Sequence, residues 1–151
     1  MLKNVTRKIR ISQLCLELIV ALLIILWVYT SISKIFDFSN FKTQLGLSPF
    51  ISGMSGFLSF AIPTGELLLA LLLVIKKTRI VGLYASFALM LMFTIYIYMM
   101  LQYAYDLPCS CGGVLAKMTW SDHLYFNGAF TIAALIGVLI VERKVYVLKT
   151  A

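Results

Sequence analysis

Charged side chains are scarce in this sequence: they make up 13% of its 151 residues, whereas about 25% is usual in soluble domains. Only six residues are Asp or Glu, and only one is His. Apolar residues reach 62%, against about 45–50% in an ordinary domain. So few polar side chains cannot cover the surface of a water-soluble globule, and so many apolar ones exclude a disordered chain. We therefore expect an integral membrane protein.

Long apolar stretches dominate what the sequence does contain, and the only charged residues within them are Glu17 and Glu66. Four apolar runs span residues 12–33, 57–75, 80–104 and 124–141, to within a few residues. Each has about the 20 residues that a helix needs to cross a bilayer, and none alternates as a barrel strand does. The first run is too long for a signal peptide, so we expect it to be retained. The sequence predicts an all-α polytopic membrane protein, a four-transmembrane-helix bundle that forms one domain over residues 1–151.

The basic residues predict the direction of these helices. Ten of the 13 Lys and Arg residues lie before the first run, between the second and third, or after the fourth. These three segments share one side of the membrane, and positive residues stay in the cytoplasm. We therefore expect both termini inside (N-in/C-in), loops 34–56 and 106–123 outside, and a location in the bacterial inner (cytoplasmic) membrane. The net charge of +7 then reflects this asymmetry, and no nucleic-acid partner is expected.

The first outer loop contains a short amphipathic pattern. Its apolar positions have helical spacing and are Phe38, Phe41 and Leu45. The polar positions between them are Asp37, Asn40 and Gln44. This pattern favours a short helix in the headgroup layer that ends at Ser48-Pro49. The alternative is an apolar connector without regular structure.

Two of the three cysteines, Cys109 and Cys111, lie one residue apart in the second outer loop. Thiols in an oxidising compartment form disulfides or exchange with other proteins. Pro108 and the glycines at 112 and 113 favour the tight turn that a bridge across one residue requires. So small a ring is strained and easily reduced. The pattern therefore favours a redox-active pair over a structural disulfide.

Other interpretations of this loop stay open. The two cysteines are alternatively free thiols, structural links to another protein, or ligands of a soft metal ion together with Asp122 and His123. We expect no metal, because no second Cys or His cluster completes a familiar zinc pattern. The third cysteine, Cys15, is expected to be a small buried apolar residue.

Polar side chains gather in the outer halves of the four runs. They are Thr30, Ser31, Ser33 and Lys34 in the first run, Ser59, Thr64 and Glu66 in the second, Thr94, Tyr98 and Gln102 in the third, and His123, Asn127 and Thr131 in the fourth. Polar groups within a membrane face the bundle interior or a wet cavity. These residues therefore predict an outward-opening polar pocket just below the two cysteines.

Two ionisable residues of this set are candidates for chemistry. Glu66 lies roughly 13 Å into its helix at about 1.5 Å per residue, where a carboxylate must be protonated or paired. It is either a proton-handling or substrate-contacting group, or a side chain bonded to a neighbouring helix, and Pro63 is expected to open its helix locally. His123 is a candidate to stabilise a thiolate or relay a proton, or else an interface residue. Glu17 is expected to reach the inner interface.

Three segments carry a resemblance to a known family. They are Lys34 with Phe36-Asp37-Phe38, then Pro63-Thr-Gly-Glu66-Leu-Leu, and Pro108-Cys-Ser-Cys-Gly-Gly113. Together they resemble the MauE branch of the DoxX-like membrane proteins, over nearly the whole chain. The resemblance implies a four-helix membrane protein associated with redox chemistry. MauE is linked to the maturation of methylamine dehydrogenase, whose small subunit is rich in disulfides, and acts together with a thioredoxin-like protein. The resemblance therefore also implies a role in the maturation of a disulfide-rich protein. It does not imply that this chain acts in methylamine metabolism.

The resemblance implies thiol–disulfide exchange in the periplasm, for which Cys109 and Cys111 are the candidate pair. Glu66 and His123, from the predicted pocket, are further catalytic candidates. A thioredoxin-like or other thiol protein, periplasmic or in the membrane, is the expected partner. Membrane thiol oxidases of the DsbB and vitamin K epoxide reductase types use two Cys pairs, one of which faces a quinone. This chain has only one outer Cys pair, so the sequence leaves open whether it uses a quinone as a cofactor. The alternatives are a non-catalytic subunit or assembly factor of a larger membrane complex, and a small-solute or metal carrier.

Overall fold

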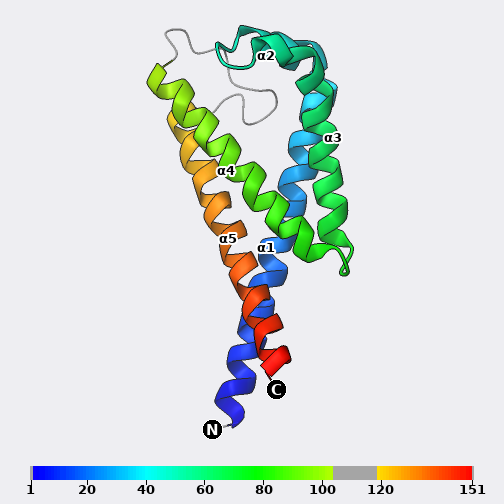
Figure 1. The fold of residues 1–151 in the computed structure, drawn as a ribbon, viewed down its shortest axis with the longest axis vertical. Coiled ribbons are helices and arrows are strands. Elements are labelled where there is room, and N and C mark those ends of the chain that lie inside the picture. The colour runs from blue at the N-terminus through cyan, green and yellow to red at the C-terminus, as the bar shows by residue number, and fades with distance from the viewer. Residues whose placement is uncertain (1, 104–118, 151) are drawn as a thin grey trace.

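The computed structural model describes residues 2–103 and 119–150, with side chains described for residues 10–103 and 119–143. Every regular element in these ranges is helical (Figure 1). The long helices are α1 (Leu2–Phe36), α3 (Ser55–Val74), α4 (Arg79–Tyr103) and α5 (Trp120–Thr150). A short helix, α2 (Phe38–Leu47), and a 3-10 turn, η1 (Ser52–Met54), join α1 to α3. Each long helix contains one apolar run and can cross a membrane, which confirms the predicted four-helix membrane bundle.

The long helices pack in two pairs. α4 packs mainly against α5 and α1 against α3, while contacts of α3 with α4 and of α1 with α5 join the pairs. Both termini and the α3–α4 turn lie toward one end of the bundle, which we call the termini end, and α2 covers the opposite α2 end (Figure 1). The three basic segments of the sequence therefore lie toward one end, as the charge pattern predicts.

Small residues bring the helices close together at the termini end. A Cβ atom on Gly82, at the start of α4, would lie 3.1 Å from the backbone of Leu72 and Leu73 on α3. A Cβ atom on Gly137 of α5 would lie 3.1 Å from Cδ2 of Leu83. Such close approaches favour helix association in a membrane. Toward the α2 end the two pairs diverge (Figure 1), which leaves room between them.

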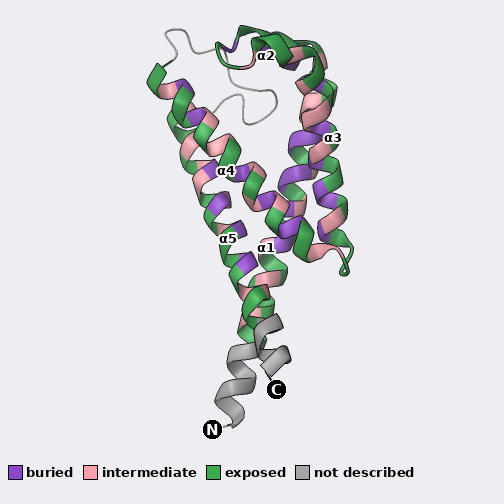
Figure 2. Ribbon diagram, in the orientation of Figure 1, coloured by how far each residue is buried: buried purple, intermediate pink, exposed green. Residues whose placement is uncertain are grey.

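The outer surface of the bundle is largely apolar. Figure 2 shows exposed positions along the outward faces of all four long helices and buried positions between them. The buried core includes Leu23, Leu73, Leu83 and Ala134. Leucine and isoleucine side chains that face outward would be costly in water but are at no disadvantage in contact with lipid. The burial pattern therefore suits a bilayer.

The short helix α2 matches the predicted amphipathic segment. It ends at Ser48, whose backbone N–H donates to the carbonyl of Leu45 at 3.3 Å. Phe41 and Leu45, on the predicted apolar face, are buried within the protein. Gln44, which the pattern assigns to the polar face, is also buried, so that prediction is wrong. Its side chain points into the bundle and donates to Oδ1 of Asn40 at 3.2 Å, a local partner that permits its burial.

Two polar contacts tie the helices together at the termini end. The Arg79 guanidinium donates to Oε1 of Glu17 at 2.7 Å, joining α4 to α1. The Tyr84 hydroxyl donates to Oε1 of Glu142, joining α4 to α5. Cys15, which we expected to be buried, is exposed, because it lies on an outward face of α1. That prediction is wrong.

Candidate functional site

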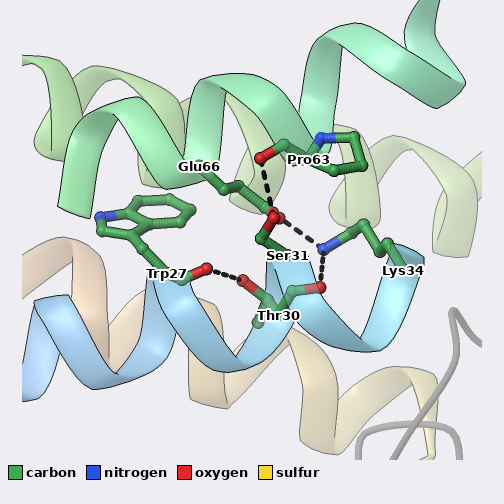
Figure 3. A network of polar contacts seen from close by, with 6 residues as sticks. All are labelled: Trp27, Thr30, Ser31, Lys34, Pro63 and Glu66. Atoms are coloured by element: carbon green, nitrogen blue, oxygen red, sulfur yellow. Dashed lines mark hydrogen bonds and ion pairs between the residues drawn. The ribbon is translucent and has the colours of Figure 1, made fainter. Parts of the chain in front are cut away.

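A buried ion pair joins α1 to α3 in the half of the bundle nearer α2. The Lys34 ammonium donates to Oε1 of Glu66 at 2.8 Å (Figure 3). The Glu66 side chain is 1% exposed and that of Lys34 is 13% exposed. Removing a carboxylate or an ammonium from water costs several kcal/mol, which only a close partner offsets. Each residue of this pair therefore makes the burial of the other possible.

Lys34 is held by more than its partner. It lies in the last turn of α1, where the partial negative charge of the helix end favours a cation. Its ammonium donates to the carbonyl of Thr30, one turn back, at 3.3 Å and lies 5.8 Å from the centre of the Phe41 ring on α2, within range of a cation–π interaction. The helix end, the carboxylate and the ring together fix the position of the ammonium.

A second hydrogen bond fixes the same two helices one turn away. The Ser31 hydroxyl donates to the carbonyl of Pro63 at 2.8 Å (Figure 3). Ser31 and Lys34 are three residues apart on α1, and Pro63 and Glu66 are three apart on α3, so each helix presents one face to the other. α3 runs unbroken through Pro63, so the predicted local opening of the helix is not observed.

A cavity of about 310 Å³ lies between the two helix pairs, and α2 contributes to its wall. The side chains that line it are mostly apolar. Its aromatic members are Trp27, Tyr29, Phe41, Phe93, Tyr96, Trp120 and Phe126. The polar and charged side chains in its wall, apart from these aromatic residues, are Thr30, Ser33, Lys34, Gln44, Glu66, His123 and Asn127. The predicted pocket therefore exists, but it is an apolar and aromatic cavity with polar groups, not a polar pocket.

His123, which lines this cavity, lies next to a helix cap at the start of α5. The Thr119 hydroxyl donates to Oδ2 of Asp122 at 2.7 Å and accepts the backbone N–H of Asp122 at 3.2 Å. This reciprocal pair is a capping arrangement. The backbone N–H of His123 then donates to the Thr119 carbonyl at 2.9 Å. The cap fixes where α5 starts, and His123 and Asn127, which are four residues apart on one face of this helix, both line the cavity.

Two buried polar atoms of residues that line this cavity lack a hydrogen-bond partner in the described part of the chain. They are Oε2 of Glu66 and Nδ1 of His123. An unpaired buried polar atom costs about 1–3 kcal/mol. Such atoms are rare in native proteins and point to an unoccupied ligand position or to water. Two of the residues predicted for chemistry, Glu66 and His123, therefore meet in one cavity.

The remaining polar residues of the predicted stripes divide into two groups. Ser31, Ser59 and Thr131 are buried but bond to neighbouring backbone, and Thr94 bonds to Thr131 at 3.0 Å, joining α4 to α5. Thr64, Tyr98 and Gln102 are exposed on the outside of the bundle, so their assignment to the pocket is wrong. α4 instead presents Tyr96 with apolar residues to the cavity.

Sequence reasoning missed the identity of the partner of Glu66. The sequence pattern assigns Lys34 to the polar residues of the same pocket but does not pair it with the Glu66 carboxylate. The signal was present, since two opposite charges lie within the outer halves of neighbouring helices, where unpaired charges are costly. It also missed Trp27, which packs in the core, donates to the Ser86 hydroxyl at 3.0 Å and lines the cavity.

Cys109 and Cys111 lie outside the described residues. The segment that contains them begins after Tyr103 at the end of α4 and ends before Thr119 at the start of α5. Among the described residues no three His, Cys, Asp or Glu side chains are grouped as a metal site. Asp122, one of the alternative metal ligands, takes part in the cap of α5.

The fold and this site define a class of protein. It is a multi-pass membrane protein with four long helices in its described part and, toward one end, a cavity whose wall contains an ion pair. A family model described as methylamine utilisation protein MauE matches residues 12–140. The chain belongs to this family, which confirms the resemblance seen in the sequence. Searches of curated proteins and of solved structures gave no significant match.

Proposed function

We propose that this MauE-family protein carries out thiol–disulfide exchange at the periplasmic face of the bacterial inner membrane, through Cys109 and Cys111. The exchange supports the maturation or redox state of a partner protein, a thioredoxin-like protein being the expected class. The observation that carries the proposal is the meeting of Glu66 and His123 in one cavity at the end of the bundle where the Cys-containing segment joins α4 to α5. The basic residues at the opposite end support an outward-facing α2 end.

The exchange proceeds through a mixed disulfide. In the oxidising direction a partner thiolate attacks one sulfur of the Cys109–Cys111 disulfide, and the other sulfur leaves as a thiolate. A second partner thiolate then breaks the mixed disulfide, so the partner is oxidised and the pair reduced by two electrons. The reverse sequence of bond changes reduces a partner disulfide. His123 provides a nitrogen for the released proton, and Lys34 favours nearby negative charge.

A quinone is the co-reactant class that we propose for re-oxidising the pair. One outer Cys pair then serves both the partner and the quinone, which takes up two electrons and two protons as it becomes a quinol. The volume and aromatic wall of the cavity suit a ring of that size, because ligand sites are apolar clefts of about 300–1,000 Å³ with a few polar groups.

Trapping of the mixed disulfide tests the exchange. In a Cys111→Ser variant the Cys109 thiolate can still attack a partner disulfide, but no second thiol of this chain is left to resolve the mixed disulfide, so we expect a covalent complex that disappears on reduction. Cys15→Ser, which changes the exposed cysteine of α1, is the matched control and should trap nothing. Unchanged oxidation of partner proteins in cells carrying Cys109→Ser with Cys111→Ser would overturn the proposal.

The same experiment separates the alternatives. If the double variant still supports assembly of a membrane complex, the chain acts as a non-catalytic assembly factor or subunit. If purification without chelator yields stoichiometric metal that the double variant loses, the chain is a metal carrier. Either result contradicts exchange as the function of the Cys pair.

A further inference from the structure

The Glu66 carboxylate in the cavity wall has only one of its two oxygens hydrogen-bonded within the described part of the chain. Lys34 occupies Oε1 of Glu66, while Oε2 is buried without a partner in the described part of the chain. A carboxylate oxygen accepts hydrogen bonds and cannot donate them. What completes this site is therefore a hydrogen-bond donor, and a bare carbonyl or ether oxygen would set its lone pairs against those of Oε2.

The walls of the cavity favour a ring over a chain of water molecules. Trp27, Phe93, Tyr96 and Phe126, from α1, α4 and α5, all line it. Aromatic side chains pack favourably against other rings in offset or edge-to-face arrangements. Water fills a cavity stably only where each molecule has two to four polar partners, which the apolar and aromatic part of the wall does not provide. The cavity therefore suits an aromatic ligand with one polar end.

The wall of the cavity includes residues that are exposed on the bundle surface. Two of its lining residues are exposed at the bundle surface: Tyr29 of α1 is 37% exposed and Met92 of α4 is 60% exposed. Both lie within the segments that are long and apolar enough to cross a bilayer. A ligand that passes these residues arrives from lipid, so it must be soluble there.

We propose that the cavity binds a lipid-soluble ring that carries a hydroxyl group, a phenol in chemical class, with the hydroxyl donating to Oε2 of Glu66. His123, whose Nδ1 is the second unpartnered atom, provides a further polar contact in the same cavity. The inference deepens the proposed function, because a quinol belongs to this class, and it predicts that the hydroxylated form binds more tightly than the carbonyl form. The site itself contains no cysteine among its described residues.

The two tryptophans of the chain, Trp27 and Trp120, both line the cavity and report its occupancy directly. The probes are a brominated alkylphenol and its methyl ether, since bromine quenches tryptophan on contact and the two differ only in the donor. In detergent micelles we expect the phenol to quench at about tenfold lower concentration than the ether, the usual gain from a hydrogen bond to a charged group. Equal quenching by both would overturn the proposal.

Variants identify the acceptor. Glu66→Gln should remove most of the preference for the phenol, while Glu17→Gln, the same change at the opposite end of the bundle, should keep it. If Glu66→Gln does not fold, Leu89→Phe narrows the cavity from the α4 wall without touching the pair and should weaken quenching by both probes. A preference unaltered by Glu66→Gln, or quenching unaltered by Leu89→Phe, would contradict the assignment.

Failure of this inference is distinguishable from failure of the proposed function. The variant with both Cys109→Ser and Cys111→Ser should bind the phenol with the wild-type preference while exchange is lost. Exchange that persists in the wild type without any phenol preference leaves the thiol chemistry standing and removes only the ligand assignment.

Discussion

At the scale of single residues, the Lys34–Glu66 pair is the most consequential feature of the site. The sequence predicted that a carboxylate so deep in its helix needs protonation or a partner, because an isolated charge in lipid is costly. It did not identify the partner, since Lys34 sits at the end of α1 and its side chain, which donates to the Thr30 carbonyl one turn back, also reaches across to Glu66 on α3. The direction of a long side chain is set by packing that sequence spacing alone does not specify.

Replacing Lys34 by Met should destabilise the protein by about 3 kcal/mol, because Glu66 is then buried without its counter-charge. The measurement is the free energy of unfolding in mixed micelles by denaturing detergent. Adding Glu66→Gln to Lys34→Met should recover most of the loss. Lys42→Met, at an exposed lysine of α2, should change stability by less than about 0.5 kcal/mol. A double variant no more stable than Lys34→Met would show that the two residues are not coupled.

The Ser31 hydroxyl contributes a single interhelical hydrogen bond, to the Pro63 carbonyl. Ser31→Ala should cost about 0.6 kcal/mol, the average for such bonds in a membrane. Ser39→Ala, at an exposed serine of α2, is the control and should cost less in the same unfolding measurement. A larger loss in the control than in Ser31→Ala would rule out a stabilising role for this bond.

At the scale of helices, the sequence predicted which segments are helical far better than which way they face. Length and a nearly complete lack of charge identify a membrane helix, and each of the four runs lies in a long helix of the structure. The outward face is as apolar as the core, so hydrophobic periodicity carries little information about rotation. The pattern therefore assigns Thr64, Tyr98 and Gln102 to the pocket although they face outward. Hydrophobic periodicity likewise does not predict the cap at Thr119, which lies next to His123 at the start of α5.

Helix contact at the termini end depends on Gly82. Gly82→Ala should destabilise the bundle by about 1–3 kcal/mol, the usual cost of overpacking, because the added methyl group meets α3 backbone at 3.1 Å. Gly128→Ala is the matched control on α5, where a Cβ meets nothing within 4 Å. It should be neutral or stabilising, because Ala is the better helix former. Equal losses in both variants would contradict the close approach of α3 and α4.

At the scale of the whole molecule, a tight termini end and a divergent α2 end make the two halves of the bundle different. The basic residues gather at the first end and the cavity with its ion pair lies toward the second. The sequence predicted both the charge asymmetry and the existence of an outer pocket. It did not predict the apolar aromatic wall, because Trp27 and Tyr96 come from helices whose rotation was not known.

Labelling of Cys109 and Cys111 in spheroplasts tests the central claim, that a redox-active pair lies on the outer side of the membrane. In a Cys15→Ala background, a membrane-impermeant maleimide should add nothing to the oxidised protein and two labels after mild reduction, as counted by intact mass. Two labels without reduction would contradict a disulfide. No label after reduction until the membrane is permeabilised would place the pair inside and contradict periplasmic exchange.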